Sequence, residues 1–101
     1  MESVLARLQQ WYAAQCDGDW EHGYGIQIET LDNPGWRINI NLEGTDLKGI
    51  PFVPVEHGLK DDSTDWHRIW VENKQFQGAG DPTKLIFILD QFLVWAERAG
   101  K

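Results

Sequence analysis

Two runs of strictly alternating apolar and polar residues, joined by a turn, constrain this chain more than any other feature. They cover residues 24–30 and 36–43, and a period of two is typical of strands with one buried face. In the segment 32–35, the pair Pro34-Gly35 predicts the centre of a type II turn. The sequence therefore predicts a hairpin with one apolar and one polar face. Its apolar parity consists of Tyr24, Ile26, Ile28, Trp36, Ile38, Ile40 and Leu42.

Two amphipathic segments flank the strands and predict helices. Apolar residues recur at helical spacing in residues 3–16, and Asp17-Gly18 ends that pattern. The second helix is expected to run to about residue 99, with Asp81 as its N-cap and Pro82 at its first position.

Two further strands are expected between the hairpin and the second helix. Phe52-Val53, bracketed by prolines, predicts a short edge strand, and 65–73 alternates like the hairpin. In that last strand, His67, Ile69 and Val71 share the apolar side. We expect a polar loop at 57–65 and a break at 78–80.

The order of these elements predicts an α+β fold. The expected architecture is an antiparallel sheet of about four strands, with the N- and C-terminal helices packed on one face. A length of 101 residues predicts a single domain, 1–101. The sequence shows no signal peptide or membrane span, and its one cysteine allows no internal disulfide. We therefore expect a cytoplasmic protein.

Charge is placed unevenly along the chain. The formal net charge is −7, and no Lys or Arg occurs from Leu8 through Trp36. That stretch holds Asp17, Asp19, Glu21, Glu29 and Asp32. An acidic protein repels nucleic acid and anionic membranes and attracts basic partners, although acids also simply increase solubility. We expect a protein partner, and neither nucleic acid nor membrane; the sequence leaves the oligomeric state open.

The segment CDGDWEHGYG, residues 16–25, is the densest polar cluster. Its alternating acids resemble the start of a calcium loop, but His22 and Ile28 stand where that loop needs glycine and glutamate. Cys16 with His22 fits no nucleophile motif, and the three histidines are scattered. We expect no catalytic residue, metal or cofactor. A small hydrolase or metal-binding protein using Cys16 and His22, or a structural subunit, remains the alternative.

The polar face of the sheet is the predicted binding surface. An exposed tryptophan among polar residues is typical of a protein-binding hot spot, and Trp70 shares its parity with charged neighbours. The alternative is that Trp66 and Trp70 tuck under the 44–65 segment. Extending the first strand's parity back to residue 19 gives the predicted partner-binding set: Asp19, Glu21, Gln27, Glu29, Arg37, Asn39 and Trp70.

Two long segments resemble a known family. They are LQQWYAAQCDGDWEHGYGIQIETLDNPGW and VENKQFQGAGDPTKLIFILDQFLVWAE, and both are similar to the immunity protein 53 family of bacterial polymorphic toxin systems. The likeness runs from Leu8 to Ala96 and is weakest between Gly44 and Ser63. It implies a bacterial cytoplasmic protein that is encoded beside a toxin and neutralises it by binding. It implies no catalytic residues and does not name the toxin.

Overall fold

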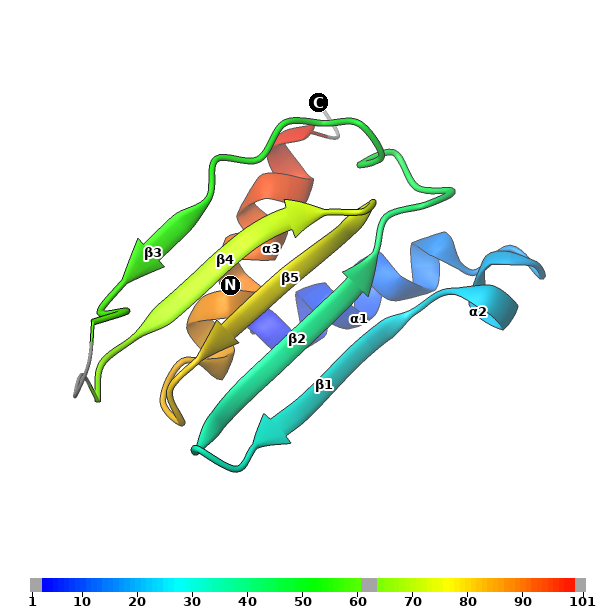
Figure 1. The fold of residues 1–101 in the computed structure, drawn as a ribbon. Helices are drawn as coiled ribbons and strands as arrows, with labels where there is room; N and C mark the ends of the chain where they lie inside the picture. Colours follow the sequence, from blue (N-terminus) through cyan, green and yellow to red (C-terminus); the bar gives the residue numbers. More distant parts are fainter. Residues whose placement is uncertain (1–2, 61–63, 100–101) are drawn as a thin grey trace.

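The fold is an antiparallel five-stranded sheet with helices on one side (Figure 1). We describe residues 3–60 and 64–99 of a computed structural model. The strands are β1 (Ile26–Leu31), β2 (Gly35–Asn41), β3 (Val55–His57), β4 (His67–Glu72) and β5 (Gln75–Gly80), and the helices are α1 (Val4–Gln15), α2 (Trp20–Gly23) and α3 (Leu85–Ala99). The strands lie in the order β1-β2-β5-β4-β3. The predicted α+β class and the one-sided helix layer are confirmed, with one strand more than expected.

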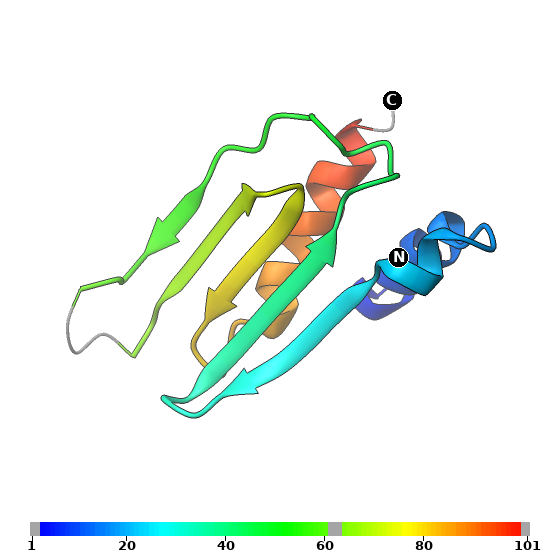
Figure 2. The same ribbon diagram turned by 45° about the vertical axis from the view of Figure 1, so that its right-hand side comes forward.

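The core lies between the sheet and the two long helices, which cover the same face (Figure 2). Two ion pairs on the surface link α1 and α3, because the Arg7 guanidinium contacts Asp90 at 2.9 Å and Glu97 at 2.8 Å. Each strand contributes alternate residues to the core, so the opposite parity faces away from the helices. The fully buried side chains are Ile38, Ile40, Leu42, Ile69, Phe76, Ile88, Leu89, Phe92 and Leu93.

The predicted hairpin is present, with Ile28 opposite Ile38 and Glu29 opposite Arg37. Its turn differs from the prediction. Gly35 is the first residue of β2, pairs with Leu31 and has no positive φ, whereas a type II turn needs a positive φ at that position. The preceding Asn33–Pro34 bond is cis.

The first strand also begins later than its alternation implied. Residues 20–23 form the short helix α2, so the prediction that Asp19 and Glu21 lie on the outward parity of a strand is wrong. Trp20 explains the difference, because its indole is only 5% exposed and donates a hydrogen bond to the carbonyl of Glu43 at 2.8 Å. A helical turn brings this ring against Trp11, with ring centroids 6.0 Å apart.

The sequence patterns missed one strand, β5, and misplaced another, β3. The glycines at 78 and 80, read as a break, belong to β5, which pairs with β2 and β4 at the centre of the sheet. Asn73 and Lys74 form the β4–β5 turn, and both have the positive φ of a two-residue hairpin. The expected edge strand at Phe52-Val53 lies instead at β3. Of the predicted loop at 57–65, residues 61–63 lie outside the described residues.

The start of the second helix was also placed too early. Asp81 and Pro82 form a separate turn, in which the Asp81 carboxylate accepts from the Thr83 amide at 2.8 Å, and α3 begins at Leu85. Asp81 therefore caps this turn instead of the helix. The predicted end of the helix at residue 99 is confirmed.

The glycines of β5 allow α3 to lie unusually close to the sheet. A Cβ atom on Gly78 would lie 2.5 Å from Cγ2 of Ile88, and one on Gly80 would lie 2.8 Å from Cβ of Lys84. Both distances are well inside the roughly 3.5 to 4.0 Å at which carbon atoms attract. These strand positions therefore need glycine, despite its low strand propensity.

We expect Gly78→Ala to lower the free energy of unfolding by about 1 to 3 kcal/mol, because the added methyl group must displace Ile88. Urea denaturation measures the change. The matched control is Gly23→Ala, since a Cβ atom there meets nothing within 4 Å. Equal unfolding free energies for the two variants would contradict the close approach of α3 to β5.

Candidate functional site

The sheet face opposite the helices carries polar residues in rows that cross the strands. One row runs from Glu29 through Arg37 and Ala79 to Arg68 and Glu56, and the residues beside each other are register partners. Its charges are negative at both edges and positive towards the middle. The next row contains Gln27, Asn39, Gln77 and Trp70. We call these two rows the open face.

Trp70 lies at the centre of a cationic cluster on the open face. The Arg68 guanidinium carbon is 4.2 Å from the Trp70 ring centroid, and that of Arg37 is 5.4 Å away. Arg37 reaches across β5 from β2, and its guanidinium donates to the Gln77 side-chain oxygen at 2.5 Å. The indole N–H donates to Glu72 at 3.1 Å. The half-buried indole is therefore contacted by two cations, each attracted to its ring face.

Trp66 and Trp70 differ in whether they contact the 44–65 segment. Trp66 lines a shallow hollow with Gly58, Leu59 and Lys60. It also lies over Gly35, where a Cβ atom would meet its ring at 3.4 Å. Trp70 instead stays on the open face between the arginines.

The acidic segment at the end of α1 is partly committed to holding its own backbone. Asp17 accepts hydrogen bonds from the amides of Trp20 and Asp19, both at 2.9 Å, and these lower the pKa of its carboxyl. Glu21 accepts from the amide of Gly18 at 2.9 Å and from that of Asp17 at 3.0 Å. Hydrogen bonds from its own amide and from these two lower the pKa of Glu21. The likeness to a calcium loop therefore reflects local capping. Asp19, which follows Gly18, is exposed.

Of the seven predicted partner-binding residues, the structure brings five together. Gln27, Glu29, Arg37, Asn39 and Trp70 lie on the open face. Asp19 and Glu21 lie beyond the end of β1, beside and within α2.

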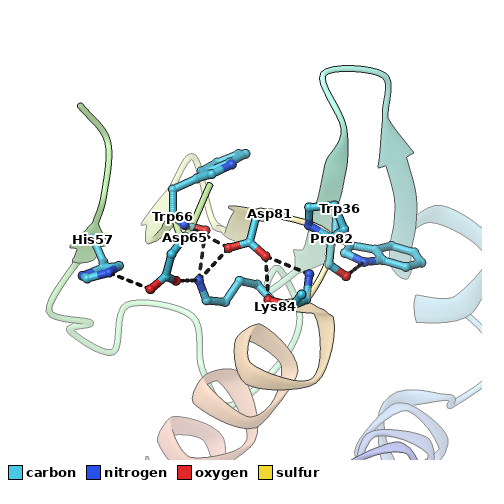
Figure 3. A network of polar contacts seen from close by, with 8 residues as sticks. Trp36, His57, Asp65, Trp66, Asp81, Pro82 and Lys84 are labelled. Carbon is cyan, nitrogen blue, oxygen red and sulfur yellow. Dashed lines mark hydrogen bonds and ion pairs between the residues drawn. The ribbon is translucent and has the colours of Figure 1, made fainter. Parts of the chain in front are cut away.

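A second polar cluster joins β4, β5 and the start of α3 (Figure 3). Asp81 is 2% exposed, and its carboxylate accepts from the Trp66 amide at 2.9 Å and from the Lys84 ammonium at 2.7 Å. Lys84 also pairs with Asp65, which in turn contacts the His57 ring at 3.3 Å. The Trp36 indole donates to the carbonyl of Pro82 at 2.9 Å.

The electrostatics of this cluster are those of a structural anchor. Burial alone would raise the pKa of Asp81, but hydrogen bonds from Lys84, Thr83 and Trp66 outweigh it and hold that pKa well below its ordinary value. For Lys84, burial would lower the pKa, and the two partner carboxylates raise it instead. Both groups are therefore fixed in their charged forms, whereas a general acid or base must change its charge near neutral pH.

Comparison with known families now identifies the group to which the chain belongs. The model of the family described as immunity protein 53 matches residues 5–97. The chain is a member of the immunity protein 53 family. No curated protein and no solved structure matches it. The match contains the open face, the Asp81 cluster and all three helices apart from Val4, Arg98 and Ala99.

The alternative thiol site of this family member consists of Cys16 and His22. Cys16 is exposed, and its thiol donates to the Tyr12 carbonyl at 3.4 Å. Within residues 3–60 and 64–99, no hydrogen bond or ion pair joins Cys16 to His22. The same residues contain no group of three or more His, Cys, Asp and Glu side chains that could hold a metal ion. None of the described helices is long and apolar enough to cross a bilayer.

Sequence reasoning missed four members of the open face, which are Glu56, Arg68, Gln77 and Ala79. Gln77 was missed because β5 was not recognised, so its pairing with Asn39 and Trp70 could not be anticipated. Arg68 shares the parity of Trp70 at a spacing of two, and this signal was present in the sequence.

We expect Asp81→Asn to lower the free energy of unfolding at pH 7 by about 1.5 to 3 kcal/mol, because a charged hydrogen-bond acceptor for Lys84 is lost. The pKa of the Asp81 carboxyl is lower in the folded protein than in the unfolded chain, so the carboxylate stabilises the fold fully at any pH above its unfolded-state pKa. This contribution to the free energy of unfolding is lost as the pH falls below that value and through the folded-state pKa. The gap between wild type and variant should therefore shrink on acidification from pH 5 towards pH 2. Denaturation across this range measures it, with exposed Asp46→Asn as control. A gap independent of pH would refute the assignment.

Proposed function

We propose that this immunity protein neutralises a cognate toxin without catalysis, by binding it with the open face in the cytoplasm of the bacterium that makes both. Family membership supports a toxin as the partner. The observation that carries the binding mode is the sheet face without helices, on which the half-buried Trp70 is contacted by Arg37 and Arg68. Seven residues form the proposed contact set: Asp19, Glu21, Gln27, Glu29, Arg37, Asn39 and Trp70.

The chemistry of the open face suits a protein interface. Hot spots are enriched in tryptophan and arginine near the centre of an interface, and their energy is greatest when neighbouring groups exclude water. Trp70 offers a large apolar surface, and its contacts with Arg37 and Arg68 restrict the ring before binding, which would reduce the side-chain entropy lost in the complex. The surrounding amides of Gln27 and Asn39 can both donate and accept hydrogen bonds.

We further propose that the toxin is basic and acts as a nuclease. A nuclease needs a basic groove for phosphates, and an acidic inhibitor can occupy such a groove. The net charge of −7 supports this, as does the position of the acids. Glu29 and Asp32 lie along β1 and its turn, and Asp19 lies beyond the other end of the strand, so acidic residues follow the β1 edge of the sheet.

Two other functions make different demands on the structure. A hydrolase using Cys16 would need a base beside the thiol, and loss of toxin neutralisation in a folded Cys16→Ser variant would support it. A structural subunit would need a large apolar face, whereas the open face is polar.

Trp70→Ala should weaken toxin binding by about 2 kcal/mol, roughly 30-fold in Kd, while the protein stays folded. Calorimetry with the polypeptide encoded beside this gene measures binding, and growth on co-expression measures neutralisation. Phe87→Ala, on the helix side, is the control, because Phe87 is also partly exposed and aromatic. Trp20→Ala should instead unfold the domain, since truncation of a buried tryptophan costs about 3 to 5 kcal/mol. Unchanged affinity of folded Trp70→Ala would reject the open face as the interface.

Charge reversal tests the basic toxin separately. Glu29→Lys, and likewise Asp19→Lys, should slow association more than it speeds dissociation, and the effect should shrink as salt rises above about 0.15 M, where the screening length is about 8 Å. Asp46→Lys is the control, since Asp46 is also an exposed acid and lies outside both rows of the open face. Glu21 is left unchanged because it caps the backbone. If the association rate changes neither with salt concentration nor with the Glu29→Lys and Asp19→Lys substitutions, these acids serve solubility alone.

A further inference from the structure

The two edges of the sheet are protected to different degrees. β3 has three residues and follows a segment containing Pro51 and Pro54, so it offers little backbone for pairing. β1 has six residues, with neither proline nor lysine among them. Within residues 3–60 and 64–99, no strand pairs with its outer side. Sheet edges are ordinarily shortened, covered or blocked by proline or lysine, because unpaired amides and carbonyls invite another strand. β1 has none of these protections.

An apolar groove lies along the same edge, between β1 and α1. Its volume is about 570 Å³. Leu5 and Tyr12 of α1 line one wall and are 57% and 37% exposed, and Tyr24 and Ile26 line the other. Ile28 lies on the helix-facing parity of β1 and is still 40% exposed, because the helix layer stops short of this edge. Figure 2 shows α1 beside the β1 side of the sheet, away from β3.

Charge decides which occupant suits this edge. The outward parity of β1 carries Glu29, Asp32 follows the strand, and no Lys or Arg lies between Leu8 and Trp36. A second copy of the chain would bring the same acids against these, and like charges in opposite strands repel. A basic strand would instead meet the opposite charge of Glu29 on one parity and the apolar groove on the other.

We propose that an extended segment of the cognate toxin pairs with β1 as an additional edge strand. Because side chains alternate along a strand, one parity of this segment is apolar and enters the groove beside Ile26 and Leu5. The other parity is basic and lies beside Glu29. The inference rests on the proposed function and extends it, because it names the form and the sequence pattern of the toxin segment.

The test compares two double variants that make the same chemical change. Leu5→Gln with Ile28→Gln removes apolar surface from one wall of the groove and from the helix-facing side of β1 next to it. Ile86→Gln with Val53→Gln removes apolar surface from exposed positions elsewhere, 52% and 82% exposed. The probe is the polypeptide encoded beside this gene. We expect the groove variant to lose on the order of tenfold or more in affinity and the control to bind like wild type. Hydrogen exchange should show that β1 amides become protected when the probe binds.

Each result bears on a different claim. Binding by wild type with equal affinity for the groove variant and no added protection in β1 would overturn the strand pairing and leave the proposed function in place. Absence of both binding and neutralisation by wild type would overturn the proposed function and, with it, this inference. A wild-type dimer in sedimentation that the groove variant abolishes would show that a second copy of the chain occupies the edge.

Discussion

The close packing of α3 against β5 is the contact on which the rest of the structure depends. Gly78 and Gly80 remove two side chains from the centre of the sheet, and Ile88 fills the space they leave. Since β5 is the middle strand, the helix is fixed on one face, and the Asp81–Lys84 pair anchors the turn that leads into it. The opposite face is left to polar side chains.

This arrangement places basic and aromatic residues in one region of the sheet and acidic residues in another. The part of the open face around β4 is cationic and aromatic, because Arg37 and Arg68 both contact Trp70. The β1 edge is acidic on one parity and apolar on the other. A basic partner would therefore meet its strongest attraction at the edge, and its tightest packing could still form at the tryptophan. Association rate and final affinity would then depend on different residues, as is common for charged interfaces.

Local capping changes how the acidic segment should be understood. Asp17 and Glu21 have their carboxylates directed at backbone amides, and this fixes the corner between α1 and β1. Such groups contribute to the net charge and to the long-range field, but a partner could engage them only by competing with these hydrogen bonds. Glu29 and Asp32 are exposed, on β1 and in the turn that follows it.

The sequence by itself determined the alternating faces of β1, β2 and β4, the two long helices and the polar character of one sheet face. These features depend on the spacing of apolar residues within a single element, which is legible without knowledge of its neighbours. Tertiary structure alone decided the rest. QFQGAG has weak strand propensity and becomes the central strand only because β2 and β4 pair with it and α3 needs its glycines. Likewise, Trp20 leaves the strand pattern because burying its ring against Trp11 stabilises a helical turn more than alternation does. The position of Gln77 beside Trp70, and the bare edge of β1, follow from strand order, which is set by contacts distant in sequence.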